Sequence, residues 1–352
     1  MLVLLFGLAA LAAAQPVRLE RRPLDVKAAR ISGAEWDGNN LFTWGDGLAV
    51  WHVREGHGGA LRDGLFGEAG CLFDVDRDGR ADVVLQEVSG LRRLLWFRSF
   101  RWTPHVIDFD ADTHDLKPAE LFGRRGILVV HRYGQVRFYE VPADPKQRWP
   151  YREVYSFYTP SRQAGLLLHD VDGDGRTDIL CGNYWIRSPE TFEESWRLFA
   201  INTYNETPAS ATLRLALADL TGDGTPELVV AQAEMQSARL AWFDKPADPR
   251  QLWVEHRLEI RPGLRFPHGL AAADLDGDGR TDIVVGEKGG RSPRLLVFRN
   301  EGRGWFTPQK IAEGTRIHSL WIADMNEDGA LDVLVAGPRT VEWWENRSYR
   351  RK

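Results

Sequence analysis

Residues 274–284 read DLDGDGRTDIV, and this pattern recurs four more times along the chain. The other copies are DVDRDGRADVV (74–84), DVDGDGRTDIL (170–180), DLTGDGTPELV (219–229) and DMNEDGALDVL (324–334). The last three intervals between copies are 49, 55 and 50 residues, and the first, 96 residues, holds two such periods. Recurrence at this period is typical of solenoids, propellers and repeat arrays.

Two weaker copies complete the series. The segment ELFGRRGILVV (120–130) keeps the apolar run but has lost the acids, and AEWDGNNLFTWGDGLAVWH (34–52) is a shorter copy. Each copy of about 48 residues reads as four short strands separated by turns, which is the make-up of one propeller blade. We therefore predict an all-β fold: a single seven-bladed β-propeller of four-stranded blades over residues 15–347.

The two ends of the chain complement each other in this prediction. The last copy stops after TVEWWEN (340–346), before a fourth strand, and PVRLERRPLDV (16–26) has the character of the missing strand. We expect this N-terminal strand to complete the seventh blade and close the ring, which removes an open sheet edge. Residues 348–352 then form a basic tail.

Apolar positions outside the loops predict the core. A proline precedes a tryptophan by seven residues at Pro142/Trp149, Pro189/Trp196 and Pro246/Trp253. The proline ends one strand because it lacks an N–H donor, and we expect the tryptophan to pack between blades. Cys71 and Cys181 lie in apolar runs and are expected to be free, buried thiols rather than a disulfide.

The spacing D-x-D-x-D-G-x-x-D suits a calcium ion, which takes about six to eight oxygen ligands. Side chains at positions one, three and five can converge on one ion, and glycine at position six permits the turn. Position seven offers its carbonyl oxygen and position nine a carboxylate. Position twelve, a glutamate in an EF-hand, is apolar here and opens a strand. The alternative is a set of Asp/Gly turns without metal.

The predicted calcium ligands lie at positions one, three, five, seven and nine of the five loops. They are Asp74, Asp76, Asp78, Arg80 and Asp82; Asp170, Asp172, Asp174, Arg176 and Asp178; Asp219, Thr221, Asp223, Thr225 and Glu227; Asp274, Asp276, Asp278, Arg280 and Asp282; and Asp324, Asn326, Asp328, Ala330 and Asp332.

These five loops resemble FG-GAP/VCBS-type repeats, the calcium-loop repeats of integrin-α-like seven-bladed propellers. The literal FG…GAP element is absent, so the resemblance is to the VCBS-like branch. It implies a propeller with about five structural calcium ions bound in its loops. It implies less about function, because such propellers serve as adhesion modules, lectin-like binders and enzymes.

The formal net charge of -5 is too mild for a chain that binds nucleic acid through its overall charge. The five loops contribute 4+4+3+4+3 = 18 of the 50 acids at ligand positions. Five calcium ions would add ten positive charges, so the loaded protein would carry -5+10 = +5. We therefore expect a mildly basic outer face that suits an anionic glycan or a cell-surface partner.

The N-terminus predicts export. Residues 2–14 (LVLLFGLAALAAA) are apolar and end in small residues, which is typical of a secretory signal peptide over residues 1–14, although no positive charge follows Met1. A buried first strand is the alternative. The run is too short to span a membrane as a helix. We expect a secreted, periplasmic or extracellular monomer with no transmembrane span.

Candidate chemical groups lie six residues before the loops, where the innermost strands begin. These positions hold His114, His268, His318 and Glu68. Near the propeller axis they could converge to bind a transition metal or to act as general acid and base. The alternative is that the histidines are inner-strand residues bonded to neighbouring backbone. Weaker candidates are the polar loops after the second strands, such as Glu287-Lys288.

Two functions remain open from the sequence. The first is a calcium-stabilised binding or interaction module for a glycan or cell-surface ligand. The second is a carbohydrate-active enzyme, a polysaccharide lyase or sugar dehydratase that uses the His/Glu cluster. The chain contains no serine-hydrolase elbow, phosphate-binding loop or HExxH motif.

Overall fold

The computed structural model describes residues 16–24, 30–132, 134–158, 163–202 and 212–349. The predicted signal peptide (1–14) and the last residues of the predicted tail (350–352) lie outside these ranges. The described residues form β-strands joined by turns, and they include no helix that is long and apolar enough to cross a membrane.

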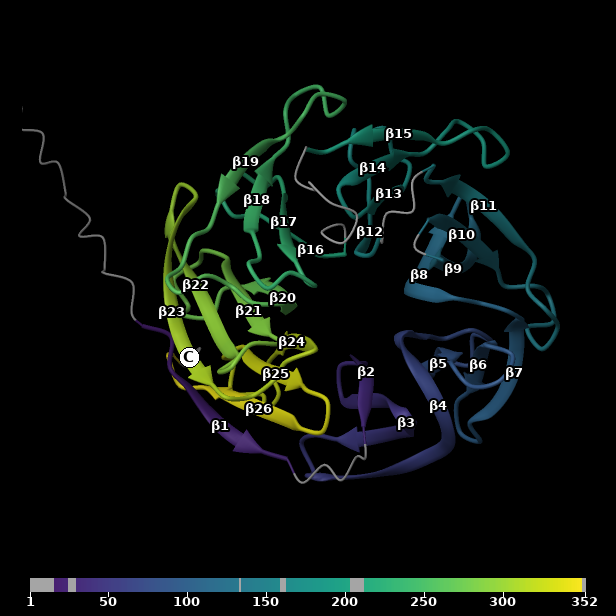
Figure 1. The fold of residues 1–352 in the computed structure, drawn as a ribbon, viewed down its shortest axis with the longest axis horizontal. Helices are drawn as coiled ribbons and strands as arrows, with labels where there is room; N and C mark the ends of the chain where they lie inside the picture. The colour runs from purple at the N-terminus through teal and green to yellow at the C-terminus, as the bar shows by residue number, and fades with distance from the viewer. Residues whose placement is uncertain (1–15, 25–29, 133, 159–162, 203–211, 350–352) are drawn as a thin grey trace, which may run out of the picture.

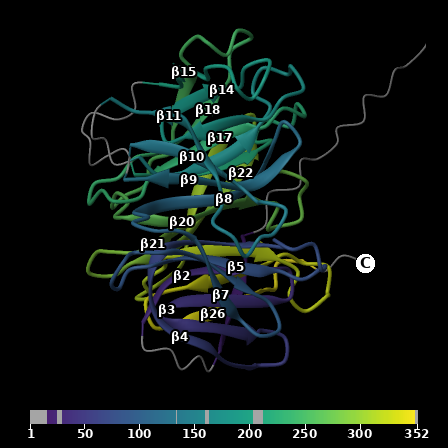
Figure 2. The same ribbon diagram turned by 90° about the vertical axis from the view of Figure 1, so that its right-hand side faces the viewer.

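The all-β prediction is confirmed. The strands form six sheets placed around a central axis, with the first strand of most sheets nearest the axis and the last at the periphery (Figure 1). In the side view, β14 and β15 lie at one end of the molecule and β3, β4 and β26 at the other (Figure 2). This radial arrangement of antiparallel sheets is a β-propeller.

Five of the sheets have four strands each. They consist of β8 (Thr113–Leu121), β9 (Arg124–His131), β10 (Gln135–Glu140) and β11 (Tyr151–Ser156); β12 (Leu166–His169), β13 (Asp178–Cys181), β14 (Tyr184–Arg187) and β15 (Arg197–Ala200); β16 (Leu213–Ala218), β17 (Glu227–Gln232), β18 (Leu240–Asp244) and β19 (Val254–Arg257); β20 (Pro267–Ala273), β21 (Asp282–Glu287), β22 (Arg294–Gly302) and β23 (Trp305–Glu313); and β24 (Ser319–Ala323), β25 (Asp332–Ala336) and β26 (Val341–Asn346) with β1 (Leu19–Pro23).

The sixth sheet has six strands. In order they are β2 (Ile31–Trp36), β3 (Asn40–His52), β4 (His57–Phe73), β5 (Asp82–Glu87), β6 (Leu94–Arg98) and β7 (Thr103–Asp108).

The prediction of seven separate blades is wrong, because this sheet covers the part of the chain where two repeats were expected. The cause is β4, a single strand of 17 residues. Its first half pairs with β3 and its second half with β5. The strand contains no proline that would interrupt it, and a register shift between Phe66 and Gly70 follows the point where its pairing passes from β3 to β5.

The N-terminal strand pairs with the last repeat. β1 is antiparallel to β26, from Leu19 opposite Asn346 to Pro23 opposite Glu342, and becomes the outer strand of that sheet. An ion pair between Arg22 Nε and Glu345 Oε2, at 2.8 Å, supports the pairing. The N-terminal residues thus supply the fourth strand that the last repeat lacks.

Apolar side chains fill the spaces between neighbouring sheets. Trp149, Trp196 and Trp253 are each buried in a different one of these clusters, so the tryptophans are core residues as predicted. Cys71 and Cys181 are free and buried, which confirms the second core prediction. Burial raises the pKa of both thiols.

Candidate functional site

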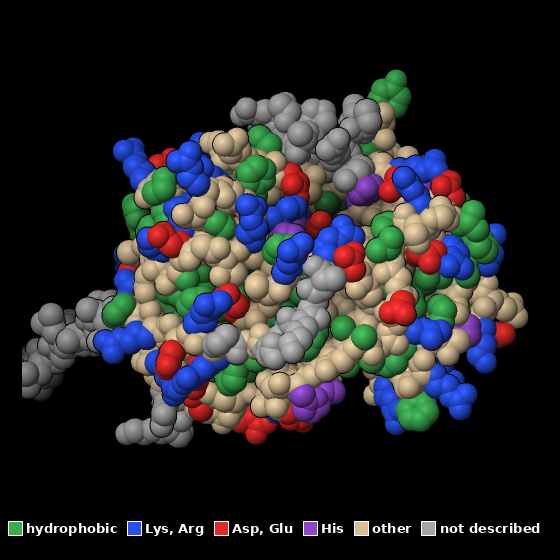
Figure 3. All heavy atoms as spheres, turned by 60° about the horizontal axis from the view of Figure 1, so that its bottom comes forward, with side chains coloured by type: hydrophobic (Ala, Val, Ile, Leu, Met, Phe, Trp, Pro, Cys, Tyr) green, Lys and Arg blue, Asp and Glu red, His purple; other side chains and the backbone are tan. Residues whose placement is uncertain are grey.

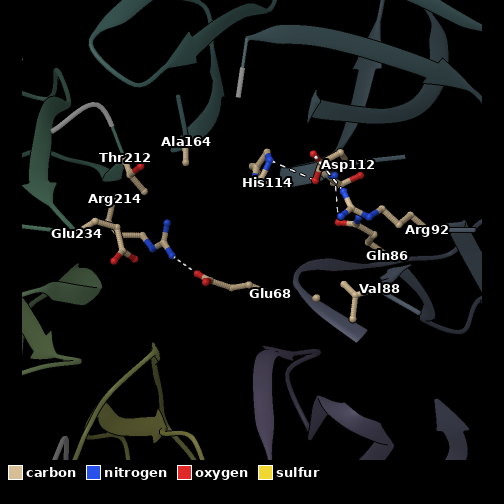
Figure 4. A pocket seen from close by; sticks show the side chains of 12 residues that line it. Glu68, Gln86, Val88, Arg92, Asp112, His114, Ala164, Thr212, Arg214 and Glu234 are labelled. Carbon is tan, nitrogen blue, oxygen red and sulfur yellow. Dashed lines mark hydrogen bonds and ion pairs between the residues drawn. The ribbon is translucent and has the colours of Figure 1, made fainter. Parts of the chain in front are cut away.

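A cavity of about 580 Å³ lies near the axis of the propeller (Figure 4). Its wall is largely polar and takes side chains from several sheets. Glu68 comes from β4, His114 from β8 and Arg214 from β16, while Glu234 follows β17. Figure 4 places His114 and Asp112 across the cavity from Arg214 and Glu234. The propeller axis therefore brings together charged groups that are far apart in the sequence.

A second cavity of about 320 Å³ shares Glu68, His114 and Arg214 with the first and adds His268 and His318. The four residues singled out from their place before the loops thus line one cavity. The rings of His268 and His318 lie 5.9 Å apart, centroid to centroid. His114 belongs to the other side, where its Nε2 lies 3.4 Å from Asp112 Oδ1.

Arg214 and Glu68 form an ion pair between the two cavities. Arg214 Nη2 lies 2.5 Å from Glu68 Oε1, and Arg214 Nε donates to the backbone oxygen of His268 at 3.3 Å. Glu68 is the more exposed partner, with 49% of its side chain accessible against 24% for Arg214. Burial by itself would raise the pKa of Glu68, but the nearby His268, Arg214 and Lys288 outweigh it and lower the pKa.

His268 is the buried centre of this group. Its Nδ1 lies 3.0 Å from the backbone oxygen of His318, and its Nε2 lies 3.0 Å from Glu234 Oε1. Lys288 Nζ donates to the same Glu234 oxygen at 2.7 Å. Burial, and after it the charge of Arg214, lowers the pKa of His268. Both ring nitrogens already have protein partners, so His268 is a structural part of the wall.

The other ionisable groups respond to the same surroundings. Burial opposes ionisation of Glu234, but the hydrogen bonds from His268 and Lys288 prevail and lower its pKa to about 2. Burial and the nearby His268 lower the pKa of His318 to about 4. At neutral pH the two cavities are therefore lined by the ionised carboxylates of Glu68 and Glu234, by the guanidinium of Arg214 and by a neutral His318.

The acidic loops share one hydrogen-bonding pattern. The carboxylate at position one accepts backbone N–H groups from the turn, as Asp274 does from Gly277 at 2.7 Å and from Gly279 at 2.9 Å. The carboxylate at position nine ties the loop to the sheet: Asp282 accepts N–H groups from Leu275 at 3.1 Å and from Asn300 at 2.8 Å. The repeated sequence pattern thus forms a loop whose carboxylates accept hydrogen bonds from the loop's own backbone and from the adjoining strand.

Four of the five loops bring three carboxylates close together. Their ligand oxygens lie within 4.8 Å of one another in the groups Asp74/Asp76/Asp78, Asp170/Asp172/Asp178, Asp219/Asp223/Glu227 and Asp274/Asp276/Asp282. These are the groups of this kind among the described residues, and none contains a histidine. The possible transition-metal site at His114, His268, His318 and Glu68 is therefore not among these groups.

The residues at position three fit a cation. Asp76, Asp172 and Asp276 each have one carboxylate oxygen that is buried and lacks a hydrogen-bond partner. Asp276 as a whole is only 8% exposed. A buried carboxylate oxygen without a partner is costly, and hard oxygens of this kind are the ligands that calcium prefers. The loop at Asp324 has Asn326 at this position and forms no such group.

Sequence reasoning missed Arg214 and Glu234. Arg214 lies five residues before Asp219, one position away from those compared, and its signal is a lone charge in the apolar strand LRLALA. Glu234 lies in the turn after β17, and Lys288 lies in the corresponding turn after β21, where a polar loop was noted as a weaker candidate. Turns after second strands therefore contribute to the cavity together with the inner strands.

Comparisons with known proteins agree with the repeats and the fold. Residues 170–230, 219–285 and 274–335 each match the family model described as FG-GAP-like repeat. No curated protein matches the sequence. Among solved structures, the protein is similar to Chaetomium thermophilum Raptor over 94% of this chain, with a TM-score of 0.54 and 11% identity. This chain spans 30% of the length of that protein, and the likeness shows the fold alone.

Each family match begins at the first aspartate of one loop and ends inside the second strand of the next repeat. The matched unit is therefore the repeat that the acidic loops define. The loops, the sheets around one axis and the three matches identify this chain as a β-propeller with FG-GAP-like repeats.

Proposed function

We propose that this protein is an interaction module that binds a glycan or a cell-surface ligand at its axial cavity. The observation that carries this proposal is the polar wall of that cavity, to which three sheets contribute: Glu68 comes from one, His114 from another, and Arg214 and Glu234 from a third. Binding sites are commonly concave and place a few polar groups with precision. Here the strands of the propeller hold those polar groups in position.

The chemistry of the wall favours a hydroxyl-rich ligand. It offers guanidinium donors and carboxylate acceptors side by side, and Arg92 and Asp112 add a second pair of opposite charge, 3.6 Å apart. On the face seen in Figure 3, acidic and basic side chains are likewise interspersed. Such a surface does not select a polyanion by charge alone, which agrees with a glycan and disfavours nucleic acid.

Calcium is the second part of the proposal. About five ions, one in each acidic loop, would be bound by the oxygen ligands at positions one, three, five, seven and nine and would turn the formal charge from -5 to +5. Its support is the set of buried, unpartnered oxygens of Asp76, Asp172 and Asp276. We further propose that the chain is exported, where calcium is abundant, as a monomer, and that β1 closes the propeller ring.

The test is binding of the full chain to an array of glycans in calcium-containing buffer, with Arg214→Gln as the site variant. Arg250 is a matched control, because it is an exposed arginine paired with Asp248 in the turn between β18 and β19. We expect Arg214→Gln to lose binding and Arg250→Gln to keep it. Equal binding by both variants would remove the axial cavity from the proposal.

An enzymatic role is the second candidate, because His318 lines the cavity in a neutral state suited to a general base. In a β-elimination, the base takes the proton next to a uronate carboxylate. The C–O bond at the β-carbon then breaks, a C=C bond forms, and the departing oxygen is protonated. Ultraviolet absorbance of the unsaturated product, lost in His318→Ala, would support this role. No absorbance with uronate polymers would count against it.

A further inference from the structure

In each sheet, one residue of the third strand faces the acidic loop. Its charge is correlated with the residue at position three of that loop. The strands are in equivalent register: Val83 pairs with Phe97, Leu228 with Phe243 and Val333 with Trp344. The residue after this partner therefore lies opposite position nine of every loop. These five residues are Arg98, Arg187, Asp244, Arg299 and Glu345.

The charge of this third-strand residue depends on position three of the loop, which divides the loops into two types. Where position three is aspartate (Asp76, Asp172, Asp276), the third strand supplies an arginine (Arg98, Arg187, Arg299). Where position three is neutral (Thr221, Asn326), the third strand supplies an acid (Asp244, Glu345). Position seven changes with them, from Arg80, Arg176 and Arg280 to Thr225 and Ala330. Each of the five loops thus keeps four carboxylates, counting the third strand.

In two of the three loops of the first type, the arginine of the third strand contacts the aspartate at position three. Arg98 Nε lies 2.5 Å from Asp76 Oδ2, and Arg187 Nε lies 2.5 Å from Asp172 Oδ2. In both aspartates the other oxygen, Oδ1, is the buried one without a hydrogen-bond partner. The guanidinium therefore fixes the carboxylate from one side and leaves its second oxygen for a cation.

In the loop at Asp324 the acid of the third strand, Glu345, contacts position three. Asn326 Oδ1 accepts the N–H of Asp328 at 3.1 Å, as Asp276 Oδ1 accepts that of Asp278 at 3.2 Å. Asn326 Nδ2 therefore corresponds to the unpartnered oxygen of Asp276.

Two carboxylates converge on that nitrogen. Asn326 Nδ2 donates to Asp328 Oδ2 and to Glu345 Oε1, each at 3.1 Å. Glu345 thus places a carboxylate beside position three, where the loops of the first type have the carboxylate of an aspartate.

We propose that Glu345 and Asp244 are cation ligands of the loops at Asp324 and Asp219, and that Arg98 and Arg187 are positioning residues for Asp76 and Asp172. This inference rests on the proposed calcium binding. It adds that the fourth carboxylate of two sites comes from the third strand of the same sheet, outside the repeated loop motif. Position seven of the second type of loop carries no arginine, and Glu345 pairs with Arg22 and Arg347 through Oε2, so that its Oε1 faces Asn326.

The experiment is a calorimetric calcium titration of the full chain after removal of metal with a chelator. We expect about five calcium ions in the wild type. Glu345→Gln and Asp244→Asn should each weaken one site by about ten- to a hundredfold, so each variant retains four strong sites. Arg187→Gln should keep five sites and change the affinity of one.

Matched controls separate charge loss from ligand loss. Asp248→Asn and Glu313→Gln each remove an exposed acid that pairs with a basic neighbour away from the loops. Both controls should titrate like the wild type.

The outcomes of the titration test the ligand assignment and calcium binding separately. Five sites in Glu345→Gln and in Asp244→Asn, with unchanged affinities, would overturn the ligand assignment and leave calcium binding intact. Three sites in the wild type would likewise restrict calcium to the aspartate-type loops and overturn it. A wild type that binds no calcium would overturn the calcium proposal itself. Circular dichroism of each variant in chelator checks that the fold is kept.

Discussion

Arg214 and Glu68 meet across the axis of the propeller, with Nη2 2.5 Å from Oε1, although 146 positions separate them in the chain. One comes from β16 and the other from β4, so the pair spans sheets that are not neighbours in sequence. Both side chains are partly exposed to the cavity. An ion pair of this kind contributes little to stability and leaves its groups available to a ligand.

We therefore predict that Arg214→Gln changes ligand binding and barely changes folding. The free energy of unfolding should fall by less than about 1 kcal/mol, as for other partly exposed ion pairs. Thermal unfolding of Arg214→Gln, Glu68→Gln and the double variant would measure this directly. A loss of several kcal/mol would show that the pair holds the sheets together.

Calcium should stabilise the folded protein. A ligand that binds only the folded state adds about 2.7 kcal/mol per site at a concentration of a hundred times Kd. We expect the melting temperature to fall in chelator and to recover when calcium is returned. An identical melting temperature under both conditions would contradict the calcium proposal.

Asp276→Asn should act in opposite directions in the two conditions. Without calcium it removes a buried charge with an unpartnered oxygen, which should leave stability unchanged or raise it. With calcium it removes a ligand, so the gain on adding calcium should shrink. Asp248→Asn, in an exposed turn, is the matched control and should leave the gain unchanged.

Two asparagines link neighbouring sheets through the loops. Asn300 Nδ2 donates to the backbone oxygen of Leu220, and Asn346 Nδ2 to that of Leu275, both at 2.8 Å. Both asparagines are 1% exposed. Truncation to alanine would leave buried carbonyl groups unsatisfied, so we predict a cost of about 1–3 kcal/mol for each variant. Exposed Asn39→Ala, measured by the same denaturant unfolding, should cost much less.

Acid should destabilise the fold through its buried histidines. Burial lowers the pKa of His131 and of His318 to about 4 each. Because their folded pKa values lie below the unfolded value of about 6.5, the unfolded state binds protons first. Their contribution is complete above about pH 6.5 and is lost as pH falls toward 4. Denaturant titrations between pH 7 and 4 should show this loss, and it should be smaller in His131→Gln.

The sequence predicted the repeat and the local loops well, because both depend on short-range spacing. The glycine and aspartate positions determine the turn, and the apolar runs determine the strands. The number of sheets was wrong because β4 continues across a boundary that periodicity alone placed in a turn. Whether a strand ends there depends on its partners β3 and β5, which no local pattern records.

The cavity was predicted only in part for a similar reason. Comparing equivalent positions found His268 and His318, whose rings lie near each other. This comparison could not find Arg214, because the position of Arg214 matters through its ion pair with Glu68, which lies on another sheet around the axis. Pairs that meet across a propeller share no sequence spacing.

The reactivity of the two buried cysteines can report when neighbouring sheets of the propeller separate. Cys71 lies in the apolar cluster on one side of the β8–β11 sheet and Cys181 in the cluster on the other side. Only a thiolate reacts readily, and a buried thiol with a raised pKa is inert until its surroundings open. The labelling rate of each thiol by an alkylating reagent would then time the separation of one interface, so the order in which the propeller comes apart can be read without introducing a probe.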